Sequence, residues 1–244
     1  MILVFLINLI VGALVGVSGI AGFLLPIFYI SVLHLDTSEA LAMSFAAFIV
    51  SGVFGSFNYA RKKLLNFKLA GVMSIGSFLA SFLGVKANLL ISPRIVMLIL
   101  YGVVFFAGLS ILFRKDKPRT DSHYNQPLLV VIGFVTGFIC AVTGAGGPII
   151  VLPILIILGI EVHEAVGIAL FNSIFIGIPA VIGYLNHSNS QAILWLLPVA
   201  LIAHGIGVWF GSRNGDRVNQ RLLKSAIAIF SISIAAYKLL GGLL

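Results

Sequence analysis

The sequence predicts an all-α integral membrane protein built from two copies of a four-segment unit. Hydrophobic residues make up 60% of its 244 positions and charged residues only 9%, whereas soluble domains carry about 25% charged residues. Apolar runs of about 20 residues, the length of a membrane-spanning helix, recur along the chain, and no period-two alternation of a β-barrel competes with them. The two halves also match each other at a fixed spacing, which indicates an internal duplication.

A polar linker, Arg114–Gln126, divides the apolar segments into four and four. We therefore expect a first unit at residues 1–113, a linker at residues 114–126 and a second unit at residues 127–244, all within one membrane domain. The segments run Ile2–Leu33, Ser38–Ala60, Phe67–Val85, Pro93–Phe113, Pro127–Ile160, His163–Leu185, Ala192–Ser212 and Leu222–Leu240.

The duplication is visible as pairs of identical or similar residues. One set lies 125 residues apart: Glu39-Ala40 with Glu164-Ala165, Gly52 with Gly177, and Tyr59 with Tyr184. A second set lies 127 residues apart: Gly84, Lys86 and Arg94 with Gly211, Arg213 and Arg221. Repeats at a constant offset are the sequence signature of a duplicated structural unit.

The first segment of each unit is too long to cross the membrane once. As a single helix, Ile2–Leu33 would span about 48 Å, against a hydrocarbon core of about 30 Å. Each such segment contains a glycine-rich stretch, Ser18-Gly19-Ile20-Ala21-Gly22 or Thr143-Gly144-Ala145-Gly146-Gly147-Pro148. Glycine interrupts a helix at low cost, and proline suits the first turn of a new one. The segment is either one long kinked helix or two half-helices that return to the same side.

The distribution of basic residues favours the re-entrant arrangement. If all eight segments cross, nine Lys and Arg face one side and six face the other; if both long segments return, the split is twelve to three. Basic residues concentrate in cytoplasmic loops, so we expect three crossings per half. Because three crossings are an odd number, the second copy would have the opposite orientation in the membrane to the first. Inverted repeats with broken helices are an architecture of secondary transporters.

With these glycines in view, the sequence resembles the TauE/SafE family of sulfite-exporter-like permeases over its whole length. The second half carries the fuller pattern. The matching residues are Gly133, Gly137, Gly144-Ala145-Gly146-Gly147, Pro153, Glu164-Ala165-Val166-Gly167, Tyr184, Gly207, Gly211, Arg213 and Arg221. The resemblance implies transport of a sulfur oxyanion or organosulfonate, such as sulfite, thiosulfate or sulfoacetate, by a multi-pass protein of the cytoplasmic (inner) membrane.

The residues themselves also favour an anion. Backbone N–H groups at helix starts, unobstructed where glycine stands, form a cradle for oxyanions. We expect such a cradle at Gly144, Ala145, Gly146 and Gly147, with a counterpart at Ser18, Gly19 and Gly22. The other glycines of these segments, Gly12, Gly16, Gly133 and Gly137, fit close helix packing instead.

Neutral polar side chains within the apolar segments would complete the substrate site. The main candidates are Asn172, Ser173, Ser44 and His204; further candidates are Cys140, Thr143, Ser51, Tyr59 and Tyr184. Hydrogen bonding between helices is the commoner use of such residues, so both interpretations stand for each of them.

Several functional classes are disfavoured. All seven acidic residues lie at or near segment ends, whereas cation transporters and proton pumps usually keep an acid within the membrane. We expect no metal, no cofactor and no catalytic residue. The net charge is +8, but the basic residues lie in short loops between segments, so the charge does not indicate nucleic-acid binding. Without a Gly-Lys-Ser/Thr motif, the chain by itself lacks the means to pump with ATP.

The expected partners are a small anionic substrate and the lipid bilayer. A homodimer and a sulfur-accepting or coupling partner remain open. Two other interpretations also remain: a membrane scaffold or assembly subunit whose glycines only pack, and an intramembrane enzyme. A cavity with polar walls would distinguish a transporter from the scaffold, and an acid–base pair near Ser18 or His204 would indicate the enzyme.

Overall fold

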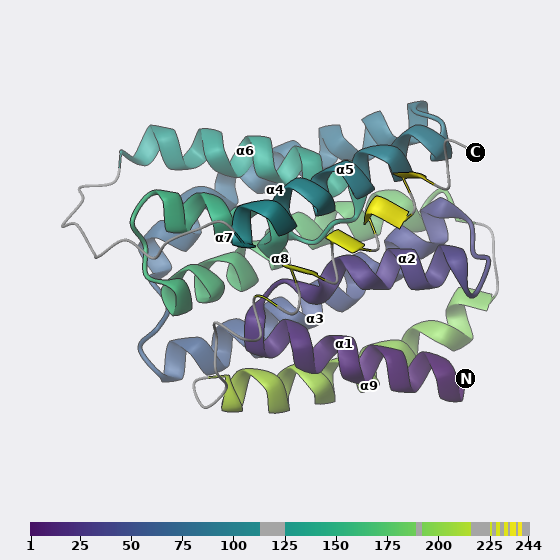
Figure 1. Ribbon diagram of the computed structural model, residues 1–244, viewed down its shortest axis with the longest axis horizontal. Helices are drawn as coiled ribbons and strands as arrows, with labels where there is room; N and C mark the ends of the chain where they lie inside the picture. The colour runs from purple at the N-terminus through teal and green to yellow at the C-terminus, as the bar shows by residue number, and fades with distance from the viewer. Residues whose placement is uncertain are drawn as a thin grey trace.

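The computed structural model describes residues 1–112, 125–188 and 192–215, together with scattered positions between 225 and 240. Every regular element in these residues is helical, and the long helices lie side by side along the long axis of the molecule (Figure 1). The elements are α1 (Ile2–Ser18), η1 (Ala21–Phe23), α2 (Leu24–Ser31), α3 (Thr37–Arg61), α4 (Phe67–Leu90), α5 (Pro93–Leu112), α6 (Gln126–Thr143), α7 (Gly147–Ile157), α8 (Val162–Leu185) and α9 (Ala192–Asn214). The linker before Asn125 and most of the expected segment Leu222–Leu240 lie outside the described residues.

Among the described helices, six are long and apolar enough to cross a membrane by length and composition: α3, α4, α5, α6, α8 and α9. Large apolar side chains cover the outside of the bundle, for example Leu90, Phe106 and Trp195, which are 88%, 70% and 73% exposed. Such a surface suits a lipid environment and not water. The predicted class, an all-α multi-pass membrane protein, is confirmed.

Both long segments are broken at the expected glycines. α1 ends at Ser18, and Gly19 follows in the left-handed conformation with φ 73°. α6 ends at Thr143, and Gly144 follows with φ 68°. Glycine adopts this conformation without a steric penalty, which is why it terminates helices in this way. Neither segment is a single kinked helix.

After the first break the chain turns back along itself. The Tyr29 hydroxyl of α2 donates a hydrogen bond of 2.8 Å to the Asn8 side chain of α1, and both residues are buried. Because Asn8 precedes the break and Tyr29 follows it, α2 runs back beside α1. In Figure 1, α2 and α7 lie towards opposite ends of the bundle.

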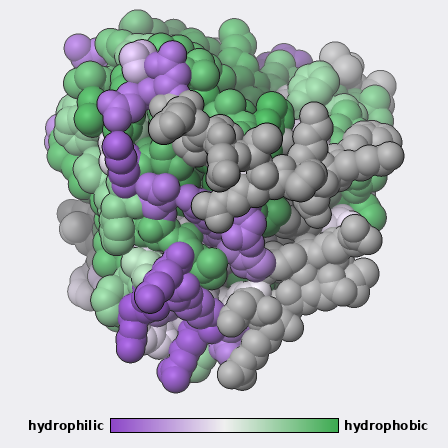
Figure 2. All heavy atoms as spheres, turned by 90° about the vertical axis from the view of Figure 1, so that its left-hand side faces the viewer, coloured by the Kyte–Doolittle hydropathy of each residue, from purple (hydrophilic) through white to green (hydrophobic). Residues whose placement is uncertain are grey.

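A contact between the ends of two helices excludes the arrangement with eight crossings. The Lys62 ammonium donates to the carbonyl oxygens of Ser212 and Arg213 at 3.3 and 2.9 Å. The ends of α3 and α9 therefore lie at the same end of the bundle, whereas eight crossings would place Lys62 and Arg213 on opposite sides. Figure 2 looks onto this end, where hydrophilic side chains gather across an otherwise apolar surface.

The remaining glycines bring helices into close contact. A methyl group added at Gly16 would lie 2.7 Å from the Ser212 nitrogen of α9, and one at Gly137 would lie 2.6 Å from Ser77 Cα of α4. Gly12 and Gly133 make equally close contacts with the backbones of His204 and Met73. The packing role expected for these four glycines is confirmed. It pairs α1 with α9 and α6 with α4, so the two halves of the chain are interleaved.

Candidate functional site

A small buried cavity lies where the two glycine breaks approach each other. The first break contributes Gly19, Ile20 and Gly22, and the second contributes Ala145, Gly146, Pro148 and Ile149; the rest of the wall is Val15, Phe48, Ser51, Leu170 and Ser173. The volume open to a water-sized sphere is about 10 Å³, at the lower limit for one water molecule. This conformation is therefore closed around the site.

The cavity extends from the turn at Gly19 towards the middle of the bundle. Gly19 lies against Val166, the fifth residue of α8, and Gly144 lies against Leu41, the fifth residue of α3. The cavity residues Ser51 and Ser173, by contrast, lie near the middle of those two helices. Each broken segment therefore passes the middle of the bundle before it turns, and residues on both sides of the first turn, from Val15 to Gly22, contribute to the wall.

A hydroxyl group stabilises each turn. Ser18 donates to the Leu14 carbonyl at 2.7 Å and accepts the Ile20 N–H at 3.2 Å. Thr143 makes the same pair of bonds with Ile139 and Ala145, at 2.7 and 3.2 Å. These bonds occupy both hydroxyls, and neither lines the cavity. In this conformation Ser18 and Thr143 shape the site without facing it.

The backbone donors are shifted relative to the cradle expected from the sequence. The Gly144 N–H is bonded to the Cys140 carbonyl at 2.8 Å, and the Ala145 N–H is bonded to Thr143. No side chain caps the start of α7 at Gly147, and N–H groups in the first turn of a helix have no acceptor within the helix. The N–H groups available to an anion therefore begin after Ala145, towards Ile149.

The polar side chains of the wall are two serines on facing helices. Ser173 donates to the Ala169 carbonyl at 2.9 Å, and a methyl group added at Gly147 would lie 2.8 Å from its Oγ. Ser51 lies 3.1 Å from the Ala47 carbonyl and 2.5 Å from His204 Nε2. His204 is completely buried and reaches the cavity only through Ser51. Its ring also interacts with the backbone of Asn8.

Asn172 is the most unusual polar group beside the cavity. It is completely buried, it precedes Ser173, and neither its amide nitrogen nor its amide oxygen has a partner among the described residues. It does not line the closed cavity. A buried unpaired amide is costly, which makes Asn172 a candidate to bind a group that enters the site. Ser44, in contrast, is satisfied by the Ala40 carbonyl at 2.7 Å and lies outside the wall.

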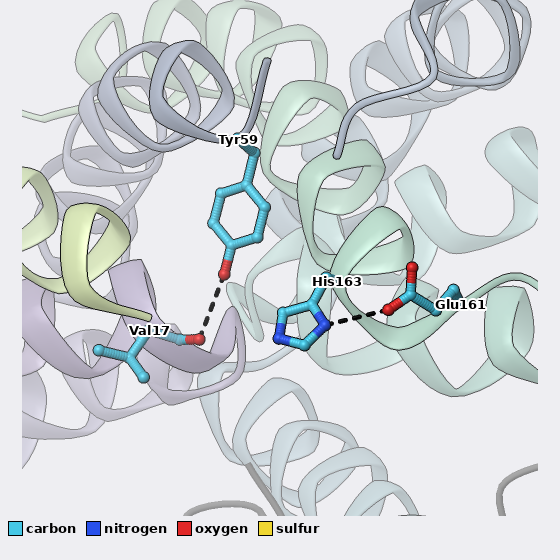
Figure 3. Close-up of polar contacts among 4 residues, drawn as sticks. All are labelled: Val17, Tyr59, Glu161 and His163. Atoms are coloured by element: carbon cyan, nitrogen blue, oxygen red, sulfur yellow. Dashed lines mark hydrogen bonds and ion pairs between the residues drawn. The ribbon is translucent and has the colours of Figure 1, made fainter. Parts of the chain in front are cut away.

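Two tyrosines bind the ends of the broken helices. Tyr184 donates to the Ala141 carbonyl at 2.6 Å. Tyr59 lies 3.3 Å from the Val17 carbonyl (Figure 3). Both residues are buried, and neither lines the cavity. Cys140 is also buried, and its sulfur lies 3.5 Å from the Gly146 carbonyl. These three side chains thus contact the backbone near the breaks.

The acidic residues Asp36, Glu39 and Glu161 make local contacts at helix starts. Asp36 and Glu39 form a capping box at the start of α3, with the Asp36 N–H donating to Glu39 at 3.3 Å. At the start of α8, His163 is bonded to Glu161 at 3.1 Å, beside the Tyr59 contact (Figure 3). The described part of the chain contains no group of three or more His, Cys, Asp or Glu that could hold a metal ion.

Most of the apolar residues that line the cavity were not predicted from the sequence. Phe48 is the largest of these residues, and it lies 125 positions before Ser173, so the internal repeat could have identified it. Val15, Ile20, Pro148, Ile149 and Leu170 have no polar signal that distinguishes them from other apolar residues of membrane helices.

Comparison with known proteins agrees with this architecture. The family profile "Sulfite exporter TauE/SafE" matches residues 2–238. The chain is 24% identical to the probable membrane transporter protein YdhB of Bacillus subtilis, covering 93% of both chains. It is 27% identical to the probable membrane transporter protein YjnA of the same organism, covering 92% of this chain and 94% of that one. It is also 26% identical to the probable membrane transporter protein MJ0441 of Methanocaldococcus jannaschii, covering 92% and 87%.

No solved structure matches the chain. The family assignment therefore rests on the sequence match, which covers nearly the whole chain, and it agrees with the glycine-broken helices and the apolar surface. The chain belongs to the sulfite exporter TauE/SafE family of membrane transporters.

Proposed function

We propose that this protein carries a small sulfur oxyanion or organosulfonate, such as sulfite, thiosulfate or a sulfoacetate-like compound, across the cytoplasmic membrane. The observation that carries the proposal is the cavity shared by both glycine breaks and by the middles of α3 and α8. Its wall contains the uncapped start of α7 and the hydroxyls of Ser51 and Ser173, which donate to the Ala47 and Ala169 carbonyls in this conformation and would turn towards an anion that enters. Hydroxyls and helix N-termini are groups that bind oxyanions.

The wall contains no charged side chain. Neutral donors suit a transported anion, because binding has to be strong enough to replace water and weak enough to release the ion. A fixed Lys or Arg in a closed site would hold the ion more tightly. A negative interior favours export, since each negative charge that leaves gains about 2.3 kcal/mol per 100 mV.

The closed cavity is too small for sulfite, so transport requires a rearrangement that widens it. We propose that the two halves are inverted repeats and that rocking of one against the other opens the site to alternate sides. Two observations support this. The broken helices approach from opposite ends of the bundle, and the turn contacts Gly19–Val166 and Gly144–Leu41 are equivalent at an offset of 125 residues.

Flux measurements in liposomes test this function. Purified protein would be assayed with radiolabelled sulfite, thiosulfate and taurine-like sulfonates, with sulfate and chloride as competitors and the potential clamped on or off. We expect saturable, potential-sensitive flux of one sulfur anion. Gly146→Leu should abolish it, because Gly146 lines the cavity with φ 82°. Gly71→Leu is the matched control, since no atom lies within 4 Å of a methyl group there.

Absence of flux across this panel, from protein with an intact thermal unfolding transition, would overturn the proposal. A scaffold whose glycines only pack would give that result. It would also tolerate Gly146→Leu provided that the fold is kept, whereas a transporter would not.

One observation favours a second function, an intramembrane serine hydrolase. Ser51 Oγ and His204 Nε2 are 2.5 Å apart, within reach for general-base activation. No carboxylate orients the histidine among the described residues, however: its ring otherwise contacts the backbone of Asn8, and an orienting carboxylate is part of the usual triad. Covalent labelling of Ser51 by a fluorophosphonate, lost in His204→Gln, would support the hydrolase; no labelling would eliminate it.

A further inference from the structure

We propose that Phe48 sets the upper size limit for the transported anion, an inference that rests on the proposed function. Phe48 lines the cavity from the middle of α3 and is 3% exposed. A methyl group added at Gly22 would lie 2.8 Å from its Cε1, and one added at Gly146 would lie 3.3 Å from its Cζ. One phenyl ring therefore contacts both glycine breaks and fills the space between them.

The internal repeat shows that this bulk is confined to one half. Phe48 lies 125 residues before Ser173, and Gly22 lies 125 residues before Gly147. The contact between Gly22 and Phe48 thus corresponds to the contact between Gly147 and Ser173, where the nearest atom is also 2.8 Å away but is a hydroxyl oxygen. At equivalent positions, the second half presents a small polar group to the site and the first half presents a ring.

The Phe48 ring also packs against other aromatic side chains. Phe48 packs edge-on against Phe45, with 5.6 Å between ring centroids, and Phe45 stacks on Tyr184 at 5.9 Å. Tyr184 is in turn bonded to the Ala141 carbonyl of α6. This row of packed aromatic side chains holds Phe48 against the breaks. The volume near the breaks then depends on the size of residue 48, which makes it a determinant of specificity.

The test is a selectivity ratio. Flux of sulfite, methanesulfonate, taurine and a longer alkanesulfonate would be measured for the wild type, Phe48→Leu, Phe48→Ala and Phe48→Ser. We expect the ratio of longer sulfonate to sulfite to rise by about tenfold or more in the alanine and serine variants, because apolar pockets discriminate added methylenes by about that factor. The leucine variant should be intermediate. Phe106→Ala, at a position 70% exposed on the outer surface, should leave the ratio unchanged.

A second readout needs no substrate. In a chain with Cys140→Ser, a cysteine introduced by Ser173→Cys would report on the cavity through its rate of modification by small and large methanethiosulfonates. Phe48→Ala should accelerate modification, and most for the large reagent. If labelling accelerates but the wild type transports no sulfur anion, the proposed function fails while Phe48 still limits the size of the cavity. If the wild type transports but neither labelling nor the selectivity ratio changes, the proposal for Phe48 is overturned.

Discussion

Tyr184 donates a hydrogen bond to the carbonyl oxygen of Ala141, and Tyr59 makes the corresponding contact with the carbonyl oxygen of Gly16, each across 43 residues of sequence. The two bonds join α3 and α8, the second apolar segment of each half, to the end of the broken helix of the same half. The bond of Tyr184 is 2.6 Å long and that of Tyr59 to Gly16 is 3.5 Å. The second half therefore makes the tighter version of a shared contact.

This difference predicts unequal effects of removing the hydroxyls. Tyr184→Phe should lower the free energy of unfolding by about 1–3 kcal/mol, because it leaves the buried Ala141 carbonyl without that partner. Tyr59→Phe should lose less through its contacts with Gly16 and Val17, since these two bonds are longer. Thermal unfolding in detergent would measure both variants. A larger loss for Tyr59→Phe would show that the hydrogen-bond lengths do not rank the two contacts.

The contact between Lys62 and Arg213 predicts the membrane topology. In a Cys140→Ser chain, single cysteines at Lys63 and Arg213, both exposed, should react with an impermeant thiol reagent from the cytoplasmic side, where basic loops reside. Cysteine at Lys86, which is also exposed, should react only from the opposite side. Labelling in vesicles of known orientation would measure this. Reaction of Lys63→Cys and Arg213→Cys from different sides would contradict the fold.

Some glycines allow two helices to pack closely, and others face open space. Gly137→Ala should destabilise the protein by about 1–3 kcal/mol, because overpacking forces the α6 and α4 backbones apart. Its methyl group would lie 2.6 Å from Ser77 Cα. Gly71→Ala, with nothing within 4 Å, should instead stabilise α4 by about 0.5–1 kcal/mol. Unfolding midpoints of the two variants would test the contrast. Equal shifts in the same direction would argue against close packing of α6 on α4 at Gly137.

The unpaired amide of Asn172 predicts a separation of stability from transport. Asn172→Leu should keep or raise the unfolding midpoint, because replacing an unpaired polar group with an apolar one of similar shape removes its desolvation cost. Flux should fall if this amide joins the site when it widens. Asn8→Leu is the control: Asn8 is bonded to Val4 and Tyr29, so this change should destabilise by about 1–3 kcal/mol. An equal loss of stability in Asn172→Leu would mean that the amide is already satisfied.

Part of the site could be predicted from single residues. The breaks at Gly19 and Gly144 followed from segment length and local backbone preference, and Gly22, Gly146, Ala145 and Ser173 do line the cavity. The roles of Ser18 and Thr143 could not be predicted, since a hydroxyl next to a break can face a ligand or cap the turn, and only the positions of Leu14 and Ile139 decide. Ser51 and His204 were separate candidates, and their contact spans 153 residues of sequence.

The sequence by itself determined the membrane class, the two breaks and the family, and it predicts the duplication. These features follow from hydrophobicity, from the conformational freedom of glycine, or from spacing along the chain. All three can be recognised without knowing which residues meet in space. Tertiary structure alone decided which backbone N–H groups remain available, and it placed the ring of Phe48 between Gly22 and Gly146. Those outcomes depend on side chains far apart in the sequence that occupy the same few ångströms, and packing of that kind is fixed only when the helices are assembled.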